Sequence, residues 1–198
     1  MRTLARYFCG TALCIAAALL AGCAMPRMID SEVQSFVGTA PAVTGASYRF
    51  DRLPSQANSP ARDQIEALAD EALTRVGLRR DPSTPRYLVQ VSLGVEGMRN
   101  PYYRPTRPRL VLGTNGVWYE QSLFMDLEIP WFRHTVHLLL REATTGQVAY
   151  ETTATFDSPW NDTLNLLPPM LEAALSDYPT PGTRKVVVEL PRHGSGVR

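Results

Sequence analysis

Two carboxylates with a suggestive spacing raise the possibility of acid–base chemistry. Asp126 and Glu128 are two residues apart, so a β-strand would present both side chains on one face. A carboxylate pair of this kind can hydrolyse a substrate by acid–base catalysis. However, Met125, Leu127 and Ile129 alternate with the two acids, which is also typical of a half-exposed strand. The pattern therefore leaves two interpretations open, a hydrolase site and an ordinary strand with one polar face.

Two histidines invite a metal hypothesis. His134 and His137 lie in a strand-like run, where an odd spacing sends their side chains to opposite faces. His134 shares its face with Val136 and Leu138, so we expect it to be a core or edge histidine. The two side chains cannot bind one ion from a regular strand. We expect neither a metal nor another cofactor.

The motifs of the common enzyme classes are missing from the sequence. It contains no G-x-S-x-G, no H-E-x-x-H, no phosphate-binding loop and no G-x-G-x-x-G. We therefore expect a protein without catalytic activity.

The first 22 residues have the pattern of a bacterial signal peptide. Arg2 and Arg6 form a short positive region, and residues 7–20 carry no charge. This apolar run is shorter than the roughly 20 residues that a membrane-spanning helix needs. The small residues in Leu20-Ala21-Gly22 then precede Cys23, which resembles the lipobox of bacterial lipoproteins.

This resemblance implies that the Cys23 thiol is acylated and that the peptide is cut just before it. Cys9 and Cys14 would leave with the signal peptide, so Cys23 would have no disulfide partner. Three acyl chains, palmitate among them, contribute about 0.8 kcal/mol per buried methylene and would hold the protein on a membrane. Ala24 follows the cysteine, and by the sorting rules of such lipoproteins this implies the periplasmic leaflet of the outer membrane.

A basic, proline-rich segment at 98–109 is the candidate partner-binding loop. It has four arginines, two tyrosines and three prolines without one acid. Tyrosine and arginine are favoured at recognition hot spots, and proline lowers the entropy lost on ordering. An anionic lipid, a sugar polymer or a protein would fit this chemistry, and a solvated loop is the alternative. The candidate binding residues are Tyr102, Tyr103, Arg104, Arg107 and Arg109.

The remaining sequence predicts alternating strands and two helices. Ser59-Pro60 begins an amphipathic helix over 60–76, with Ile65, Leu68, Ala69, Ala72, Leu73 and Val76 on its core face. A second helix is expected over 161–178, its start left open by Pro168-Pro169. Alternation predicts strands at 48–53, 87–95, 118–129, 131–141, 147–157 and 185–190. Residues 98–117 are expected to be a long loop.

These elements predict an α+β fold, a two-layer sandwich of a mainly antiparallel sheet with two helices on one face. The expected order of segments is a signal peptide at 1–22, a lipidated N-terminus and flexible tether at 23–46, one domain at 47–191 and a disordered tail at 192–198. Without residues 1–22 the chain has 18 basic and 19 acidic residues. This near-neutral charge argues against nucleic-acid binding.

Six segments resemble a bacterial lipoprotein family known as domain of unknown function 4136. They are Ser47-Tyr48-Arg49-Phe50, the helix end at 73–78, the strand at 87–91, the two runs at 138–142 and 146–151, and Leu175-Ser176-Asp177-Tyr178-Pro179. The resemblance covers roughly residues 47–191 and implies no reaction. We therefore expect a membrane-anchored envelope lipoprotein that acts as a non-catalytic binding or scaffolding module. The alternatives are an envelope hydrolase that uses Asp126 and Glu128, and a carrier of a small ligand.

Overall fold

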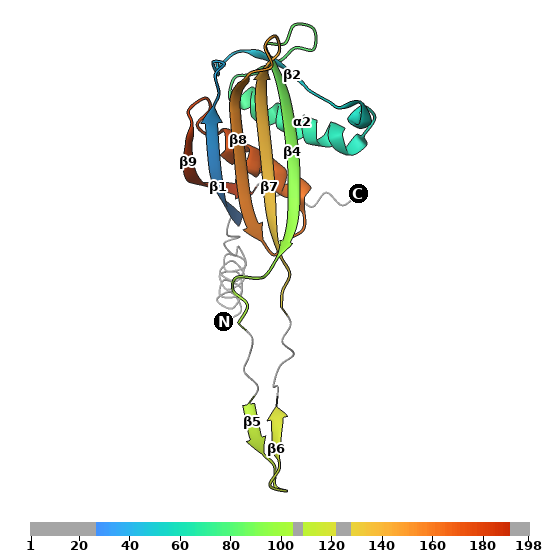
Figure 1. Cartoon of the computed structure of the whole chain (residues 1–198), viewed down its shortest axis with the longest axis vertical. Coiled ribbons are helices and arrows are strands. Elements are labelled where there is room, and N and C mark those ends of the chain that lie inside the picture. The colour runs from blue at the N-terminus through green and yellow to red at the C-terminus, as the bar shows by residue number, and fades with distance from the viewer. Residues whose placement is uncertain (1–26, 105–108, 122–127, 191–198) are drawn as a thin grey trace, which may run out of the picture. The chain divides into compact units, whose positions relative to one another are not determined.

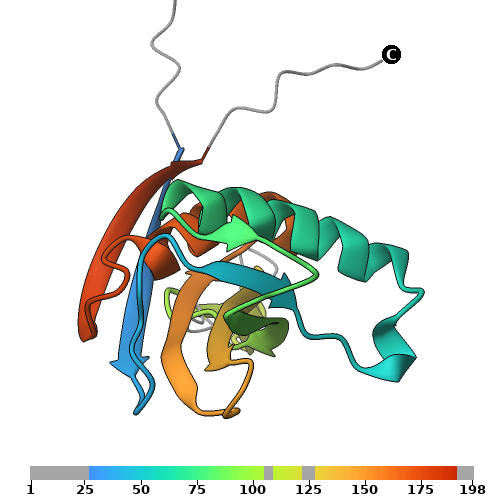
Figure 2. The same cartoon turned by 90° about the horizontal axis from the view of Figure 1, so that it is seen from above.

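A seven-stranded sheet forms one layer of the protein, and two helices cover one of its faces (Figures 1 and 2). The computed structural model describes residues 27–104, 109–121 and 128–190. The compact unit of the described chain spans Met28–Leu190. The expected two-layer α+β sandwich with a mainly antiparallel sheet is confirmed.

The strands of the large sheet follow the order β3-β2-β4-β7-β8-β1-β9. β2 is parallel to β3 and β4, whereas the pairs β4–β7, β7–β8 and β8–β1 are antiparallel. A separate two-stranded sheet pairs β5 with β6. The elements are β1 (Arg27–Val37), β2 (Ser47–Phe50), η1 (Pro54–Gln56), α2 (Pro60–Arg75), β3 (Arg79–Arg80), β4 (Tyr87–Met98), β5 (Arg109–Leu112), β6 (Trp118–Gln121), β7 (Trp131–Glu142), β8 (Val148–Ser158), α3 (Thr163–Leu175) and β9 (Gly182–Leu190).

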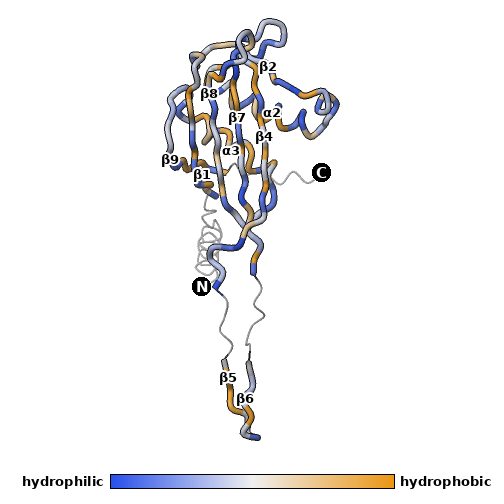
Figure 3. The backbone as a smooth tube through the Cα atoms, viewed as in Figure 1, coloured by the Kyte–Doolittle hydropathy of each residue, from blue (hydrophilic) through white to orange (hydrophobic). Residues whose placement is uncertain are grey.

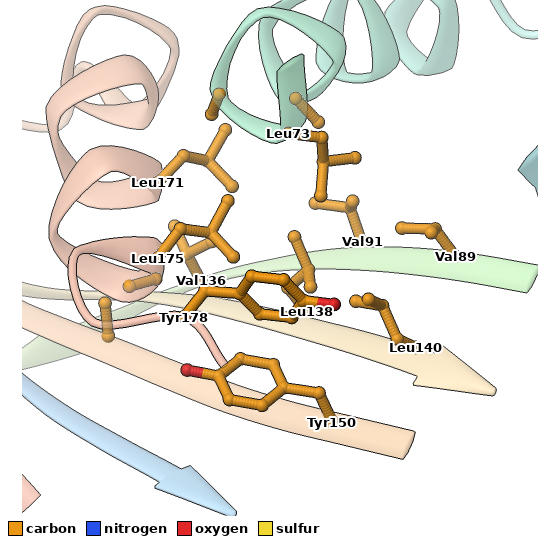
Figure 4. Close-up of a cluster of buried hydrophobic side chains, with 14 of the residues drawn as sticks. Leu73, Val89, Val91, Val136, Leu138, Leu140, Tyr150, Leu171, Leu175 and Tyr178 are labelled. Atoms are coloured by element: carbon orange, nitrogen blue, oxygen red, sulfur yellow. The ribbon is translucent and has the colours of Figure 1, made fainter. Parts of the chain in front are cut away.

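The core lies between the helices and the sheet, and strand alternation fills it (Figure 4). Buried residues alternate along the first half of β4 and along the middle of β7 and β8, because successive side chains of a strand point to opposite faces. The fully buried Leu73, Leu138, Met170 and Leu171 occupy the space where a small-ligand carrier would hold its ligand. This arrangement favours a filled core over a ligand cavity.

The two predicted helices are found with shifted ends, and a tight turn joins β7 to β8. Gly146 adopts a φ of +72° in this turn, a backbone conformation that glycine adopts readily. α3 begins at Thr163, where the Asp162 carboxylate accepts a hydrogen bond from the Asn165 N–H, and it continues through Pro168 and Pro169. Within the described part of the chain, neither helix has the length and apolarity needed to cross a bilayer.

The prediction of a flexible tether over 23–46 is wrong for its larger part. Residues 27–37 form β1, an inner strand of the sheet that pairs with β8. The next residues are held as well, because the Tyr87 hydroxyl donates to the Pro41 carbonyl at 2.5 Å and the Tyr178 hydroxyl donates to the Val43 carbonyl at 3.2 Å. The folded domain therefore starts about 20 residues earlier than the predicted boundary at residue 47.

Candidate interaction site

The connection between β4 and β7 contains the most exposed apolar surface of the described chain. We name residues 99–130 the arm. Its ends meet where Met98 of β4 pairs with Trp131 of β7, and its central part pairs again where Arg109 of β5 faces Gln121 of β6. The arm therefore leaves the sheet and returns to it as one long hairpin connection.

The centre of the arm is a regular β-hairpin, contrary to the prediction of an irregular loop over 98–117. Gly113 donates its N–H to the Val117 carbonyl at 2.8 Å, and Gly116 adopts a φ of +74° in the turn. The Asn115 side chain closes the turn, accepting from the Val117 N–H and donating to the Tyr119 hydroxyl at 2.6 Å. Of the strand expected over 118–129, the structure describes Trp118–Gln121 as β6, and residues 122–127 lie outside the described residues.

Both faces of this hairpin carry exposed apolar side chains. Leu112 faces Trp118 across the two strands, and Val111 faces Tyr119, so the two pairs lie on opposite faces. The exposed fractions are 62% for Leu110, 40% for Val111, 53% for Leu112, 52% for Val117, 63% for Trp118 and 51% for Tyr119. We name residues Leu110–Tyr119 the hairpin tip. Figure 3 shows β5 as a hydrophobic segment of the chain.

The base of the arm is ordered by one asparagine and one tyrosine. Asn100 donates its backbone N–H to the Glu128 carboxylate at 2.9 Å and its side-chain amide to the Ile129 carbonyl at 3.2 Å. Tyr102 packs its ring against Trp131 in an edge-to-face contact with 5.4 Å between ring centres. These contacts tie the outgoing and returning chains together where they meet the sheet.

The predicted binding residues are only partly placed by the structure. Tyr102 and Arg104 are exposed at the base of the arm, and Tyr103 is half-buried there. Arg109 begins β5. Arg107 lies outside the described residues, as do Cys23 and the segment Leu20-Ala21-Gly22 that precedes it.

Sequence reasoning identified the basic part of the arm and missed its apolar tip. The missed pattern is an apolar run, a turn containing Asn115-Gly116, and a second apolar run, which is a typical hairpin signature. The tip was overlooked because proline and arginine dominate the preceding residues and favour a loop.

The carboxylate pair cannot be assembled from the described residues. Asp126 lies outside them, and the Glu128 side chain is exposed and accepts the hydrogen bond from Asn100. The role that the structure gives to Glu128 is therefore to hold the base of the arm.

The two histidines lie on opposite faces of β7, as their spacing predicts. His134 is fully buried, and its Nε2 atom lies 2.7 Å from the Trp160 carbonyl oxygen and 3.3 Å from Ser158 Oγ. Its Nδ1 atom lies 3.3 Å from Thr163 Oγ1. Ser158 Oγ also donates to the Trp160 carbonyl at 3.1 Å, so this buried serine–histidine pair connects β7, β8 and the start of α3 and is not presented to a substrate.

His137 belongs to the polar face of the sheet that the helices leave uncovered. Its Nε2 atom lies 2.9 Å from a Glu151 carboxylate oxygen. On the same face, Arg133 binds Asp157 through two hydrogen bonds of 2.8 Å, which lowers the pKa of the Asp157 carboxyl. These side chains pair with one another on the sheet, whereas the hairpin tip exposes apolar area. Among the described residues, no group of three His, Cys, Asp or Glu side chains could hold a metal ion.

The core tyrosines of the fold come from the segments that carry the family resemblance. Tyr150 packs edge-to-face against Tyr178, with 4.9 Å between ring centres. Burial raises the pKa of the Tyr178 and Tyr48 hydroxyls, and Tyr48 donates a hydrogen bond to Asp70 of α2. The sequence model of the family described as "Domain of unknown function (DUF4136)" matches residues 34–180. The chain belongs to this family.

The DUF4136 match includes both helices, the strands from β2 to β8 and the whole arm. It confirms the family expected from the sequence, and its first residue lies inside β1, 13 residues before the predicted domain boundary at residue 47. No curated protein matches the chain.

One solved structure shares the fold at low sequence identity, and two further structures are similar at lower TM-scores. A PDZ domain protein from Parabacteroides distasonis is 15% identical with a TM-score of 0.51, covering 86% of this chain and 41% of that one. The chain thus spans less than half the length of that protein. Two structures of the PelC dodecamer from Paraburkholderia phytofirmans are 16% and 15% identical with TM-scores of 0.42 and 0.41, each covering 74% of this chain and 95% of theirs.

Proposed function

We propose that this DUF4136 protein is an envelope lipoprotein, anchored in a membrane through acylated Cys23, and that it is a non-catalytic module that binds its target with the arm. The observation that carries the proposal is the exposed apolar hairpin tip that follows the arginine-rich segment 98–109. A two-stranded hairpin is at best marginally stable in water by itself, and contiguous exposed apolar residues mark interaction sites. The tip therefore has the character of a surface that is covered in the working protein.

The short distance along the chain between Cys23 and the sheet supports the anchoring part of the proposal. The compact unit begins at Met28, five residues after Cys23. An extended chain gains at most about 3.6 Å per residue, so an acylated Cys23 would hold this end of β1 within about 18 Å of the bilayer surface. The domain would then work close to its membrane. Ala24 after the cysteine favours the periplasmic leaflet of the outer membrane as the site.

Replacing Cys23 by serine tests the anchor. In bacterial cells that are fed labelled palmitate, the wild-type chain should carry the label and sediment with membranes. The Cys23→Ser variant should carry no label, because the hydroxyl does not replace the thiol as acyl acceptor. A labelled Cys23→Ser variant would contradict the anchor, and Cys9→Ser is the matched control that should leave labelling unchanged.

Photocrosslinking in intact cells tests the role of the arm. A photoreactive amino acid at position 118 should form adducts with the target, because Trp118 is 63% exposed at the hairpin tip. The same group at position 53 is the matched control, since Leu53 is 57% exposed but lies before η1, outside the arm. Equal adduct yields at the two positions, or none at 118, would contradict an arm that binds.

A further inference from the structure

We propose that the target of the arm is lipid: the hairpin tip inserts into the interfacial layer of the bilayer that holds Cys23. This inference rests on the proposed function, because it places the tip in the anchoring membrane. Four observations carry it, namely the apolar character of both hairpin faces, the residue types of the tip, the charge next to it, and the end of the sheet from which the arm leaves.

Apolar side chains lie on both faces of the hairpin. This distribution favours a lipid environment that surrounds the hairpin over a protein partner that covers one face. Leu112 and Trp118 lie on one face of the hairpin, and Val111 and Tyr119 lie on the other. A protein partner that adds a flat surface would cover one of these faces and leave the other in water. A bilayer interface surrounds an inserted hairpin and covers both faces together.

The composition of the tip matches the interfacial layer. The ten residues from Leu110 to Tyr119 carry no charge, and the tip includes one tryptophan and one tyrosine. These two residue types are enriched where hydrocarbon meets headgroups, because their rings are apolar and their polar atoms bind water or headgroups. The polar turn atoms of the tip, around Thr114 and Asn115, are few and partly satisfied within the turn.

The charge next to the tip is complementary to an anionic lipid surface. Segment 98–109, which leads to the tip, contains four arginines and no acid, and Glu120 directly follows the tip on the returning strand. Arg99 and Arg104 are exposed at the base of the arm, and Arg109 directly precedes the tip. Basic residues beside an inserted segment are attracted to an anionic surface. The arm thus combines an apolar tip with a cationic flank on its outgoing side, as an interfacial anchor requires.

The arm and the lipid anchor leave the sheet at the same end. One row of paired residues crosses the sheet. It consists of Val33 in β1, Ala154 in β8, Val136 in β7 and Leu93 in β4. β1 and β7 run in the same direction, and β4 runs opposite to them. Five residues from this row, at one and the same end of the sheet, lie Met28 of β1, Trp131 of β7 and Met98 of β4. The chain from Cys23 therefore enters the sheet where the arm leaves it.

The lengths of the two connections permit both to reach one bilayer. Cys23 is five residues from Met28, which limits their separation to about 18 Å. Gly113 in the turn of the tip is 15 residues from Met98, which allows a separation of up to about 54 Å. A domain held close to the surface by its acyl chains can thus place the tip in the same leaflet.

Fluorescence of Trp118 in reconstituted vesicles tests this inference. The full acylated chain is inserted into vesicles of phosphatidylethanolamine and phosphatidylglycerol, with Trp131→Phe and Trp160→Phe leaving Trp118 as the one tryptophan. Lipids brominated along their acyl chains should quench Trp118 severalfold, and its emission should shift to the blue. In vesicles, Leu110→Ser with Leu112→Ser should reduce the quenching, and circular dichroism should show an unchanged fold.

A matched control places the single tryptophan elsewhere on the surface. Leu53→Trp combined with Trp118→Phe should give a fluorophore of similar exposure that the brominated lipids do not quench. Arg99→Ser with Arg104→Ser should reduce quenching of Trp118 in these anionic vesicles and leave it unchanged in phosphatidylcholine vesicles. Each of these results would support insertion of the tip beside a cationic flank.

Three outcomes would overturn the inference. An unquenched Trp118 on a chain whose mass shows acylated Cys23 overturns the inference alone and leaves the proposed function standing. A blue shift that grows with the protein-to-lipid ratio identifies a second copy of the chain as the occupant. A Cys23 without acyl chains overturns the inference and the proposed function together.

Discussion

Glu66→Ala is expected to lower the free energy of unfolding by about 3 kcal/mol, a large effect for a charged residue on a helix. Glu66 lies in α2 and is 3% exposed, so its carboxylate is removed from water. Its two oxygens accept hydrogen bonds of 2.7 Å from Nε and Nη2 of Arg52. The variant would leave this guanidinium without its buried partner.

A second arginine increases the expected loss. The Nε atom of Arg62 lies 3.9 Å from the same Glu66 carboxylate, and its Nη1 donates to the Val91 carbonyl at 2.6 Å. The Arg62 side chain is 15% exposed, so removing Glu66 would leave a second partly buried cation unpaired. Through these contacts Glu66 joins α2 to Arg52, two residues after the end of β2, and supports the Arg62 side chain that binds β4. The fold therefore depends on this carboxylate more than on an ordinary surface ion pair.

Asp63→Ala is the matched control, since Asp63 binds the same Arg52 at 2.8 Å but is 65% exposed. An exposed ion pair contributes at most about 1 kcal/mol, so this variant should change stability by less than that. Denaturation by urea, followed by circular dichroism, measures both variants. Equal losses for Glu66→Ala and Asp63→Ala would contradict a special role for the buried carboxylate.

The helix that contains Glu66 was predictable from the sequence, and the burial of Glu66 was not. Ala69, Ala72 and Leu73 recur at helical spacing and are buried as expected. A glutamate on the same helix normally lies in water, and its burial here depends on Arg52, which comes from another segment of the chain. Hydrophobic periodicity indicates which face of a helix or strand points to the core. It does not indicate which distant cation pairs with an acid on that face.

The arm shows a related limit of prediction from the sequence. Its arginines and tyrosines suggested an interaction site, and the structure adds six exposed apolar side chains on an adjacent hairpin. Leu110, Leu112 and Trp118 have the alternation of a strand buried against a core, so their pattern alone does not distinguish burial in the domain from exposure. The pairing of β5 with β6 outside the large sheet provides that distinction.

The first strand was the largest error of the sequence analysis, for a physical reason that can be stated. In β1 the buried residues are Ile29, Ser31, Val33 and Ser35, so half of the inward-facing positions are serines. Small polar residues weaken the apolar alternation that marks a strand. Ser35 is accommodated because its hydroxyl bonds the Thr152 hydroxyl of β8 at 3.0 Å, a contact between residues 117 positions apart. Such a partner cannot be inferred from local composition.

Removing residues 24–46, which joins Cys23 directly to Ser47, is expected to destroy the fold. The deletion removes β1 from its place between β8 and β9, so β8 loses its neighbour and β9 loses its connection to the sheet. It also removes the fully buried Ile29 and Val33 and the carbonyls that accept hydrogen bonds from Tyr87 and Tyr178. The loss should exceed about 5 kcal/mol, which is comparable to the whole stability of a domain.

Lengthening the chain at the same place separates the role of a strand from that of a tether. A flexible insert of about ten glycine and serine residues directly after Cys23 keeps β1 intact and should change the free energy of unfolding by less than about 0.5 kcal/mol. Far-UV circular dichroism and urea denaturation measure both chains. A deletion variant that unfolds cooperatively at the wild-type urea concentration would show that residues 24–46 are a spacer. Loss of the transition in the deletion variant, together with its retention in the lengthened one, places the start of the domain at β1.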